Sequence, residues 1–178
     1  MPLDIGVGIL LALGVAEYFG VQASPWFVVL GIAVTLLPDI DIITLPLLGK
    51  WYHRTHTHFP IVWMPICALA FVAFDPMYAI LLTLGIYAHL VHDTFGIGWG
   101  IAWLWPFSHR KYLLFPERGR QLPFNIVASW TPEEEAEFRE APRNAKWLEL
   151  YYFRPNIVAY IEYGVLLAAL AVLVTYYL

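Results

Sequence analysis

The positively charged residues of this chain are confined to two segments, and the sequence around those segments is almost entirely apolar. All ten Lys and Arg residues lie in the ranges 50–54 and 110–154. Of the 178 residues, 60% are hydrophobic and only 13% are charged, whereas soluble domains average about 25% charged residues. Segregated charge between long apolar runs is typical of an integral membrane protein, and the length suits a single domain over residues 1–178.

Five apolar stretches approach the length of a membrane span, which requires about 20 residues with a range of about 17 to 25. We expect helices over residues 5–19, 25–37, 60–74, 77–95 and 157–178. The turn Asp75-Pro76 separates the third helix from the fourth, because proline cannot continue a helix. The sequence therefore predicts an all-α fold, a polytopic membrane bundle of about five transmembrane helices.

The long segment over residues 96–156 lies between the fourth and fifth predicted helices. It begins with a Gly- and Trp-rich apolar stretch, residues 96–107, that is too short and too broken to span a bilayer. Because Trp favours the headgroup level, this stretch is predicted to be interfacial or re-entrant, or else a loop packed over the helix ends. Farther along, Thr131 and Pro132 predict the start of a short polar helix, whose run of glutamates would be solvated.

Alternation of five crossing helices puts the N-terminus, residues 38–59 and residues 96–156 on one side of the membrane. The opposite side then carries no Lys or Arg. The positive-inside rule makes the basic side cytoplasmic. We expect a multi-pass protein of the prokaryotic inner (cytoplasmic) membrane with a cytoplasmic N-terminus. The net charge of −4 and the lack of a basic stripe give no support to nucleic-acid binding.

Metal-ligating residue types form three groups on the predicted cytoplasmic side. Asp39 and Asp41 stand two residues apart after a proline, and such close carboxylates are relieved by a cation or by protonation. Three histidines in six residues are uncommon, and imidazole suits transition metals. They are His53, His56 and His58. Each group also has a non-functional interpretation. The aspartates could belong to an ordinary cytoplasmic loop, and the histidines to a solvent-exposed run.

The third group ends the fourth predicted helix. Asp93 lies four residues and His92 three residues after His89, so we expect all three side chains on one face of that helix. Ionisable residues in a membrane helix usually mark a functional site. A His–Asp hydrogen bond that pins helices together is the alternative for this group taken alone. The joint occurrence of all three groups on the same face of the membrane predicts a metal site of one or two ions.

The order and spacing of these motifs resemble the membrane-bound metal-dependent hydrolases, the YdjM-like group of LexA-binding, inner-membrane-associated hydrolases. The shared pattern consists of L-P-D-I-D at 37–41, H-R-T-H-T-H at 53–58, H-L-V-H-D at 89–93 and L-W-P-F at 104–107. The resemblance covers residues 25–125. It implies a shared metal-ligand or catalytic set made of Asp39, Asp41, His53, His58, His89 and Asp93. His56 and His92 stand at variable positions and are possible further ligands.

The chain departs from that pattern near its start. Members often open the first helix with a Gly-His pair, where this sequence has Asp4-Ile5-Gly6. One ligand could thus be lost, or replaced by Glu17 or His92. The glycine that follows His-Arg in the family pattern is Thr55 here.

The leading hypothesis is a hydrolase that acts at the cytoplasmic face on a lipid or a lipid-linked ester or phosphoester. A bound Zn or Mn ion would lower the pKa of water from about 16 toward about 7. The predicted catalytic residues are Asp39, Asp93 and Arg54. Arg54 is included because a guanidinium can bind a phosphate or carboxylate of the substrate with two hydrogen bonds. Arg118 and Arg120 are expected to contact lipid headgroups.

Two other classes remain open at this point. A membrane di-iron oxidase would also use histidines at a cytoplasmic face, although six histidines are few for that class and paired aspartates fit it poorly. A non-catalytic protein that binds a metal or a protein partner is the other alternative. No residue pattern identifies a protein partner, and the apolar outer halves of the helices disfavour a transporter.

Overall fold

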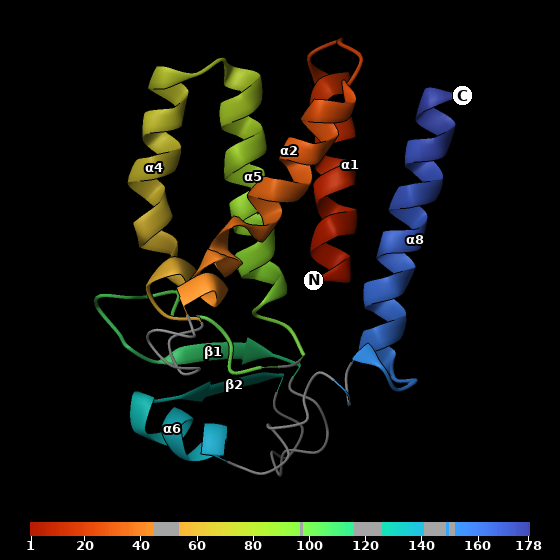
Figure 1. Cartoon of the computed structure of the whole chain (residues 1–178). Coiled ribbons are helices and arrows are strands. Elements are labelled where there is room, and N and C mark those ends of the chain that lie inside the picture. Colours follow the sequence, from red (N-terminus) through yellow and green to blue (C-terminus); the bar gives the residue numbers. More distant parts are fainter. Residues whose placement is uncertain (45–53, 97, 116–125, 141–148, 150–151) are drawn as a thin grey trace.

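Apolar helices stand side by side in the computed structural model, and a small sheet with one short helix packs across one end of them (Figure 1). The structure describes residues 1–44, 54–96, 98–115, 126–140, 149 and 152–178. The long helices are α1 (Pro2–Tyr18), α2 (Pro25–Leu36), α4 (Pro60–Ala73), α5 (Pro76–His92) and α8 (Ile157–Tyr177). Each of the five apolar stretches therefore forms a helix, as predicted, and the protein is mostly helical.

Local sequence signals explain where these helices begin. Proline occupies the first turn of α1, α2, α4 and α5, where its missing N–H is not needed. The Ser24 side chain accepts a hydrogen bond from the backbone of α2, the Asp75 side chain caps α5, and the Asn156 side chain caps α8. The helix starts are therefore set by local chemistry, independently of tertiary packing.

Helix length limits what can be said about membrane crossing. Within the described residues, two helical segments are long and apolar enough to span, Pro25–Ile43 with 19 residues and Ile157–Tyr177 with 21. Helix α4 has only 14 residues, which corresponds to about 21 Å against a hydrocarbon core of about 30 Å. Helices α1 and α5 have 17 residues each. The prediction of five crossing helices is not confirmed and stays a prediction.

Helix α1 lies at the centre of the bundle and packs against α2, α5 and α8 (Figure 1). Its contact with α2 is close, because a Cβ on Gly8 would lie 2.7 Å from the carbonyl oxygen of Gly31. Small residues that let backbones approach are typical of helix packing in membranes. Ala12 and Ala16 are fully buried on the same helix. This packing fixes the N-terminal end of α1 next to the C-terminal end of α5, where the site lies.

Helix α2 continues into a 3₁₀ helix, η1 (Leu37–Thr44), which carries the Asp39 motif. Pro38 lacks the N–H that an α-helix needs, so the chain tightens at this point. A second 3₁₀ turn, η3 (His56–His58), leads into α4. The segment between η1 and residue 54, which includes His53, lies outside the described residues.

The expectation of an all-α fold is wrong in one place, because residues 96–156 contain a sheet. Strands β1 (Lys111–Leu114) and β2 (Val127–Trp130) pair antiparallel, with Lys111 opposite Trp130. The chain after α5 also pairs with β1 through Phe95 and Ile101. The strands have only four residues each and a charged residue takes one inward position of β1. The apolar alternation that predicts a strand is therefore missing.

The predicted polar helix is present as α6 (Pro132–Glu140). Thr131 and Glu134 form a reciprocal capping box, since Glu134 N–H donates to Thr131 Oγ1 and Thr131 N–H donates to Glu134 Oε2. The glutamate run is not wholly solvated, however. Glu135 is buried and accepts a 2.7 Å hydrogen bond from Lys111 Nζ of β1. This ion pair attaches α6 to the sheet.

Candidate metal centre

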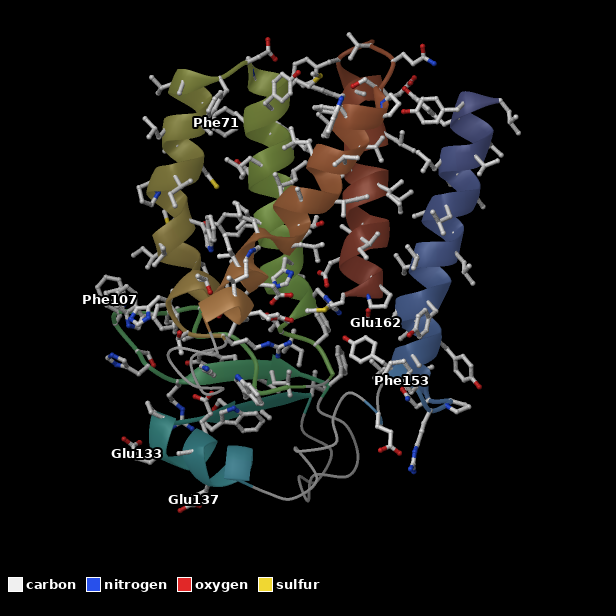
Figure 2. The ribbon with its side chains drawn as sticks, in the orientation of Figure 1. Phe71, Phe107, Glu133, Glu137, Phe153 and Glu162 are labelled. Atoms are coloured by element: carbon white, nitrogen blue, oxygen red, sulfur yellow. The ribbon has the colours of Figure 1, made fainter. Side chains whose placement is uncertain are left out.

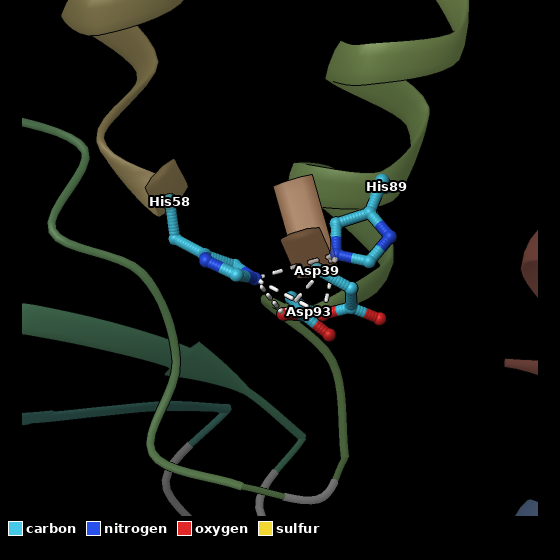
Figure 3. Close-up of side chains that lie close together, drawn as sticks. All are labelled: Asp39, His58, His89 and Asp93. Atoms are coloured by element: carbon cyan, nitrogen blue, oxygen red, sulfur yellow. Dashed lines mark hydrogen bonds and ion pairs between the residues drawn. The ribbon is translucent and has the colours of Figure 1, made fainter. Parts of the chain in front are cut away.

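Four side chains from three elements converge where the helices meet the sheet (Figure 3). Asp39 comes from η1, His58 from η3, and His89 from the last turn of α5, whose C-cap is Asp93. His58, His89 and Asp93 are buried, and Asp39 is half-buried. The spacing of His89 and Asp93 puts both on one helix face, as predicted, and the 3₁₀ segments bring the other two to that face.

The distances within this cluster are those of ligands around one ion. The Nε2 atom of His58 lies 3.4 Å from Asp39 Oδ1, 3.4 Å from Asp93 Oδ2 and 3.4 Å from His89 Nε2. His89 Nε2 lies 3.5 Å from Asp39 Oδ1 and 3.6 Å from Asp93 Oδ2. Ligand atoms about 2.0–2.2 Å from a tetrahedral ion are about 3.3–3.6 Å apart. Five of the six separations therefore match a tetrahedral site.

The donor set also fits a metal ion chemically. Two imidazoles and two carboxylates are ligands that zinc takes, and carboxylates also suit manganese. Asp93 Oδ2 is buried, and the Nε2 atoms of His58 and His89 lie 3.4 and 3.6 Å from it, so it is at most weakly hydrogen-bonded among the described residues, although a buried carboxylate oxygen is normally well bonded. A bound cation at the centre of the cluster would satisfy this oxygen.

Both histidines of the cluster have a carboxylate on their other ring nitrogen. Asp41 Oδ2 lies 3.5 Å from His58 Nδ1, and Thr57 Oγ1 lies 3.0 Å from both atoms. Asp4 Oδ1 lies 3.2 Å from His89 Nδ1. Metal-binding histidines usually carry such an outer carboxylate, which orients the ring and favours the tautomer that binds.

The charges around the cluster shift the pKa values of its members. Burial by itself would lower the pKa of His58, but hydrogen bonds with Asp39, Asp41 and Asp93 outweigh burial and raise it to about 9. Burial by itself would raise the pKa of Asp93. The charge of Arg54 and a hydrogen bond with His58 outweigh burial and hold the pKa of that carboxyl well below its usual range. The raised pKa of His58 means that these carboxylates favour a positive charge among them.

Arg54 is part of the site through its contact with Asp93. Its Nη2 donates a 2.6 Å hydrogen bond to Asp93 Oδ1, and its backbone N–H donates to Asp41 Oδ2. The Arg54 carbonyl accepts a 2.9 Å hydrogen bond from Lys111 Nζ of β1. The sheet is thereby bonded to the same residue that pairs with Asp93, so the two parts of the fold meet at Arg54.

The structure divides the predicted ligands into distinct groups. Asp39, His58, His89 and Asp93 come together, whereas Asp41 lies behind His58 and faces its outer nitrogen. His53 lies outside the described residues, as do Arg118 and Arg120.

The other candidate ligands and the two predicted replacements for a lost ligand lie away from the cluster. His56 is exposed and lies against the ring of Phe59. Glu17 is exposed near the C-terminal end of α1, at the other end of that helix from Asp4. His92 is turned away from the cluster, since its two nitrogens bond to Asp4 and Glu162.

Sequence reasoning missed three charged residues near the site. Asp4 is 2% exposed, although it stands at the position of the Gly-His pair that members of the family carry. Glu135 belongs to the glutamate run that is predicted to be solvated, yet it is buried, and so is Lys111. The one available signal was Asp4 itself, because an acidic residue at the start of an apolar membrane helix requires a partner.

The fold and the cluster together define a helical membrane protein with an Asp/His group that could hold a metal ion at one end of its bundle. The chain belongs to the YdjM inner membrane protein family, whose sequence model matches residues 4–178. This match confirms the family resemblance and a membrane location. No curated protein and no solved structure matches the chain.

Proposed function

We propose that this protein is a metal-dependent hydrolase of the inner membrane whose single ion is held by Asp39, His58, His89 and Asp93. The observation that supports the proposal is the spacing of the four ligand atoms, which lie within 4.8 Å of one another, with five of their separations at 3.4–3.6 Å. Zinc fits two imidazoles and two carboxylates, and manganese is the other candidate. When bound, such an ion would lower the pKa of water, so that hydroxide is available to attack an ester near neutral pH.

The residues beside the cluster have roles that suit hydrolysis. Asp39 is the most exposed of the four, with a side-chain exposure of 11%, so it is the carboxylate best placed to accept a proton from an attacking water. Arg54 neutralises Asp93 and could also contact a phosphate or carboxylate of a substrate. These are the predicted catalytic roles of Asp39, Asp93 and Arg54.

A lipid or lipid-linked substrate is favoured by the surroundings of Asp39. Ile40 and Ile43 follow it on η1, and both are exposed, Ile43 at 75%. Exposed apolar side chains next to a polar centre suit an amphiphile, whose acyl chain stays in the bilayer and whose ester reaches the site. We also propose the five-span topology with a cytoplasmic N-terminus. It is supported by the positions of Arg54, Arg110 and Lys111 near the sheet end of the bundle.

A non-catalytic metal-binding protein is the second candidate, and one observation favours it. Structural zinc sites are closed by four protein ligands, whereas catalytic zinc sites keep one position open. The cluster offers four protein ligands, so catalysis requires either a fifth position or the release of one carboxylate. Activity measurements on the metal-loaded protein separate the two candidates.

The experiment compares two histidines of one motif in the purified full-length chain. His58→Ala should lose stoichiometric Zn or Mn and all metal-dependent hydrolysis of fluorogenic phospholipids and lipid phosphates. His56→Ala, which changes an exposed ring two residues away, should keep both. Wild-type protein without stoichiometric metal would overturn the metal site. Metal-loaded protein that hydrolyses none of these esters favours the non-catalytic candidate, and iron with oxygen-dependent turnover favours a di-iron oxidase.

A further inference from the structure

A second group of buried polar residues connects the C-terminal helix to the metal centre. It consists of Glu162 in the second turn of α8, His92 at the end of α5, and Asp4 in the first turn of α1. Glu162 is 1% exposed and Asp4 is 2% exposed. Figure 2 shows Glu162 projecting from α8 toward the N-terminal end of α1. A carboxylate buried in an apolar helix is unfavourable unless it is paired, so the partners of Glu162 are informative.

The contacts of this group lead from α8 to a proposed ligand through two hydrogen bonds and one ion-pair contact. Glu162 Oε1 lies 2.9 Å from His92 Nε2, and His92 Nδ1 lies 3.0 Å from Asp4 Oδ1. The same oxygen of Asp4 lies 3.2 Å from Nδ1 of His89, whose Nε2 belongs to the metal cluster. Both ring nitrogens of His92 therefore have a carboxylate partner. Asp4 contacts both His92 and His89.

Glu162 also fixes the helix that carries Asp4. Its Oε2 accepts a 2.9 Å hydrogen bond from the backbone N–H of Leu3, in the first turn of α1. A negative charge is favourable at a helix N-terminus, where N–H groups have no partner within the helix. One carboxylate thus holds both the backbone of α1 and the His92 ring. Both contacts act on the position of Asp4.

We propose that Glu162 is a positioning residue for the metal centre, which acts through His92 and Asp4 to hold the imidazole of His89 in its binding orientation. The C-terminal helix is then part of the site, although none of its residues belongs to the four-residue cluster. Outer partners of metal ligands typically contribute about 10–100-fold to metal affinity. This inference rests on the metal site of the proposed function, but it does not depend on hydrolysis.

The test measures Co²⁺ binding to the purified full-length chain by competition with a chelator and by the visible spectrum of the bound ion. Glu162→Gln should weaken Co²⁺ binding by about 10-fold or more and change the spectrum, which reports ligand geometry. The matched control is Tyr176→Phe on the same helix. Tyr176 Oη accepts a 2.8 Å hydrogen bond from Ala23 N–H, at the other end of α8. The Tyr176→Phe variant should lower thermal stability while leaving the Co²⁺ affinity and the visible spectrum unchanged.

A double-mutant cycle shows whether Glu162 acts through Asp4. Asp4→Asn should weaken Co²⁺ binding by itself, and adding Glu162→Gln should weaken it little further, because both changes disrupt one path. Additive effects, or a Glu162→Gln protein with wild-type affinity and spectrum, would overturn the proposal. If Glu162→Gln does not fold, His92→Gln interrupts the same path and is judged by the same criteria. Wild-type protein that binds no metal would refute the metal site, and this inference with it.

Discussion

The two ends of the helix bundle differ in what holds them together. At the site end, which carries η1, η3 and the sheet, the structure buries Asp4, Asp41, His58, His89, Asp93, Lys111, Glu135 and Glu162. At the far end, where α1 turns into α2 and α4 into α5, the contacts are caps and tyrosine hydrogen bonds, such as Tyr176 with Ala23. Burying charge costs free energy unless it is paired.

This contrast indicates which end of the bundle carries the functional site. The far end is held by apolar packing, exposed caps and tyrosine hydrogen bonds, without a buried charged residue among those described there. The charged residues instead surround one point, where His58, His89, Asp39 and Asp93 meet. Substitutions at the site end should therefore change both metal binding and stability, whereas substitutions at the far end should change stability slightly and metal binding not at all.

The largest effect is expected for Asp93→Asn. The change keeps the shape of the side chain but removes a ligand charge, and it leaves the Arg54 guanidinium beside a neutral amide. We expect metal affinity to fall about a hundredfold or more, and stability to fall by about 3 kcal/mol, since breaking a buried ion pair is costly. Chelator competition and thermal unfolding of the full-length protein measure the two effects. Wild-type metal affinity in this variant would exclude Asp93 as a ligand.

The next effect concerns the attachment of the sheet. Lys111→Met should destabilise the protein by about 3 kcal/mol, because Glu135 stays buried and loses its 2.7 Å contact with Lys111. The double variant Lys111→Met with Glu135→Leu should recover most of that loss, since two apolar residues can replace a buried ion pair. Thermal unfolding checks both variants. A single variant as stable as the wild type would mean that the ion pair does not hold α6 to the sheet.

The pH dependence of metal binding follows from His58. Its pKa is raised to about 9 in the folded protein without metal, against an ordinary value of 6.5. A raised pKa contributes stability that is fully present below about pH 6.5 and is lost as the pH rises through about 9. A metal ion must displace this proton, so affinity should increase from pH 6.5 to 9 and binding at pH 7 should release a proton. Calorimetry in buffers of different ionisation enthalpy measures the release, and zero release would contradict this assignment.

The smallest effect is expected at the far end. Asp75→Ala removes the side chain that caps α5, so stability should fall by about 1 kcal/mol. Metal affinity should stay within twofold of the wild type, because Asp75 lies at the opposite end of α5 from His89. A clear loss of metal binding in this variant would break the contrast between the two ends.

The helices, and two residues of the cluster, could be predicted from sequence where local rules apply. Apolar runs, first-turn prolines and the capping residues Ser24, Asp75 and Asn156 determine the five helices. The four-residue spacing of His89 and Asp93 correctly places them on one helix face. The family pattern supplied Asp39 and His58, whose approach depends on 3₁₀ turns that no local rule predicts.

The errors have physical causes that no local pattern reveals. Asp39 and Asp41 stand on a 3₁₀ helix, which has about three residues per turn. Residues two apart on such a helix point in different directions. Only one of them can join the cluster, and the other faces the outer side of His58. The contacts of Glu162 with His92 and Leu3 connect residues 70 and 159 positions apart. Such pairs become visible only once the helices are packed.

The central claim is that one ion is bound by two imidazoles and two carboxylates, and X-ray absorption spectroscopy of the zinc-loaded full-length chain tests it most directly. The account predicts one zinc per chain with two nitrogen and two oxygen neighbours at about 2.0–2.2 Å, and loss of the imidazole signal in a protein that carries both His58→Ala and His89→Ala. Substoichiometric zinc, or a full imidazole signal that survives both substitutions, would contradict it.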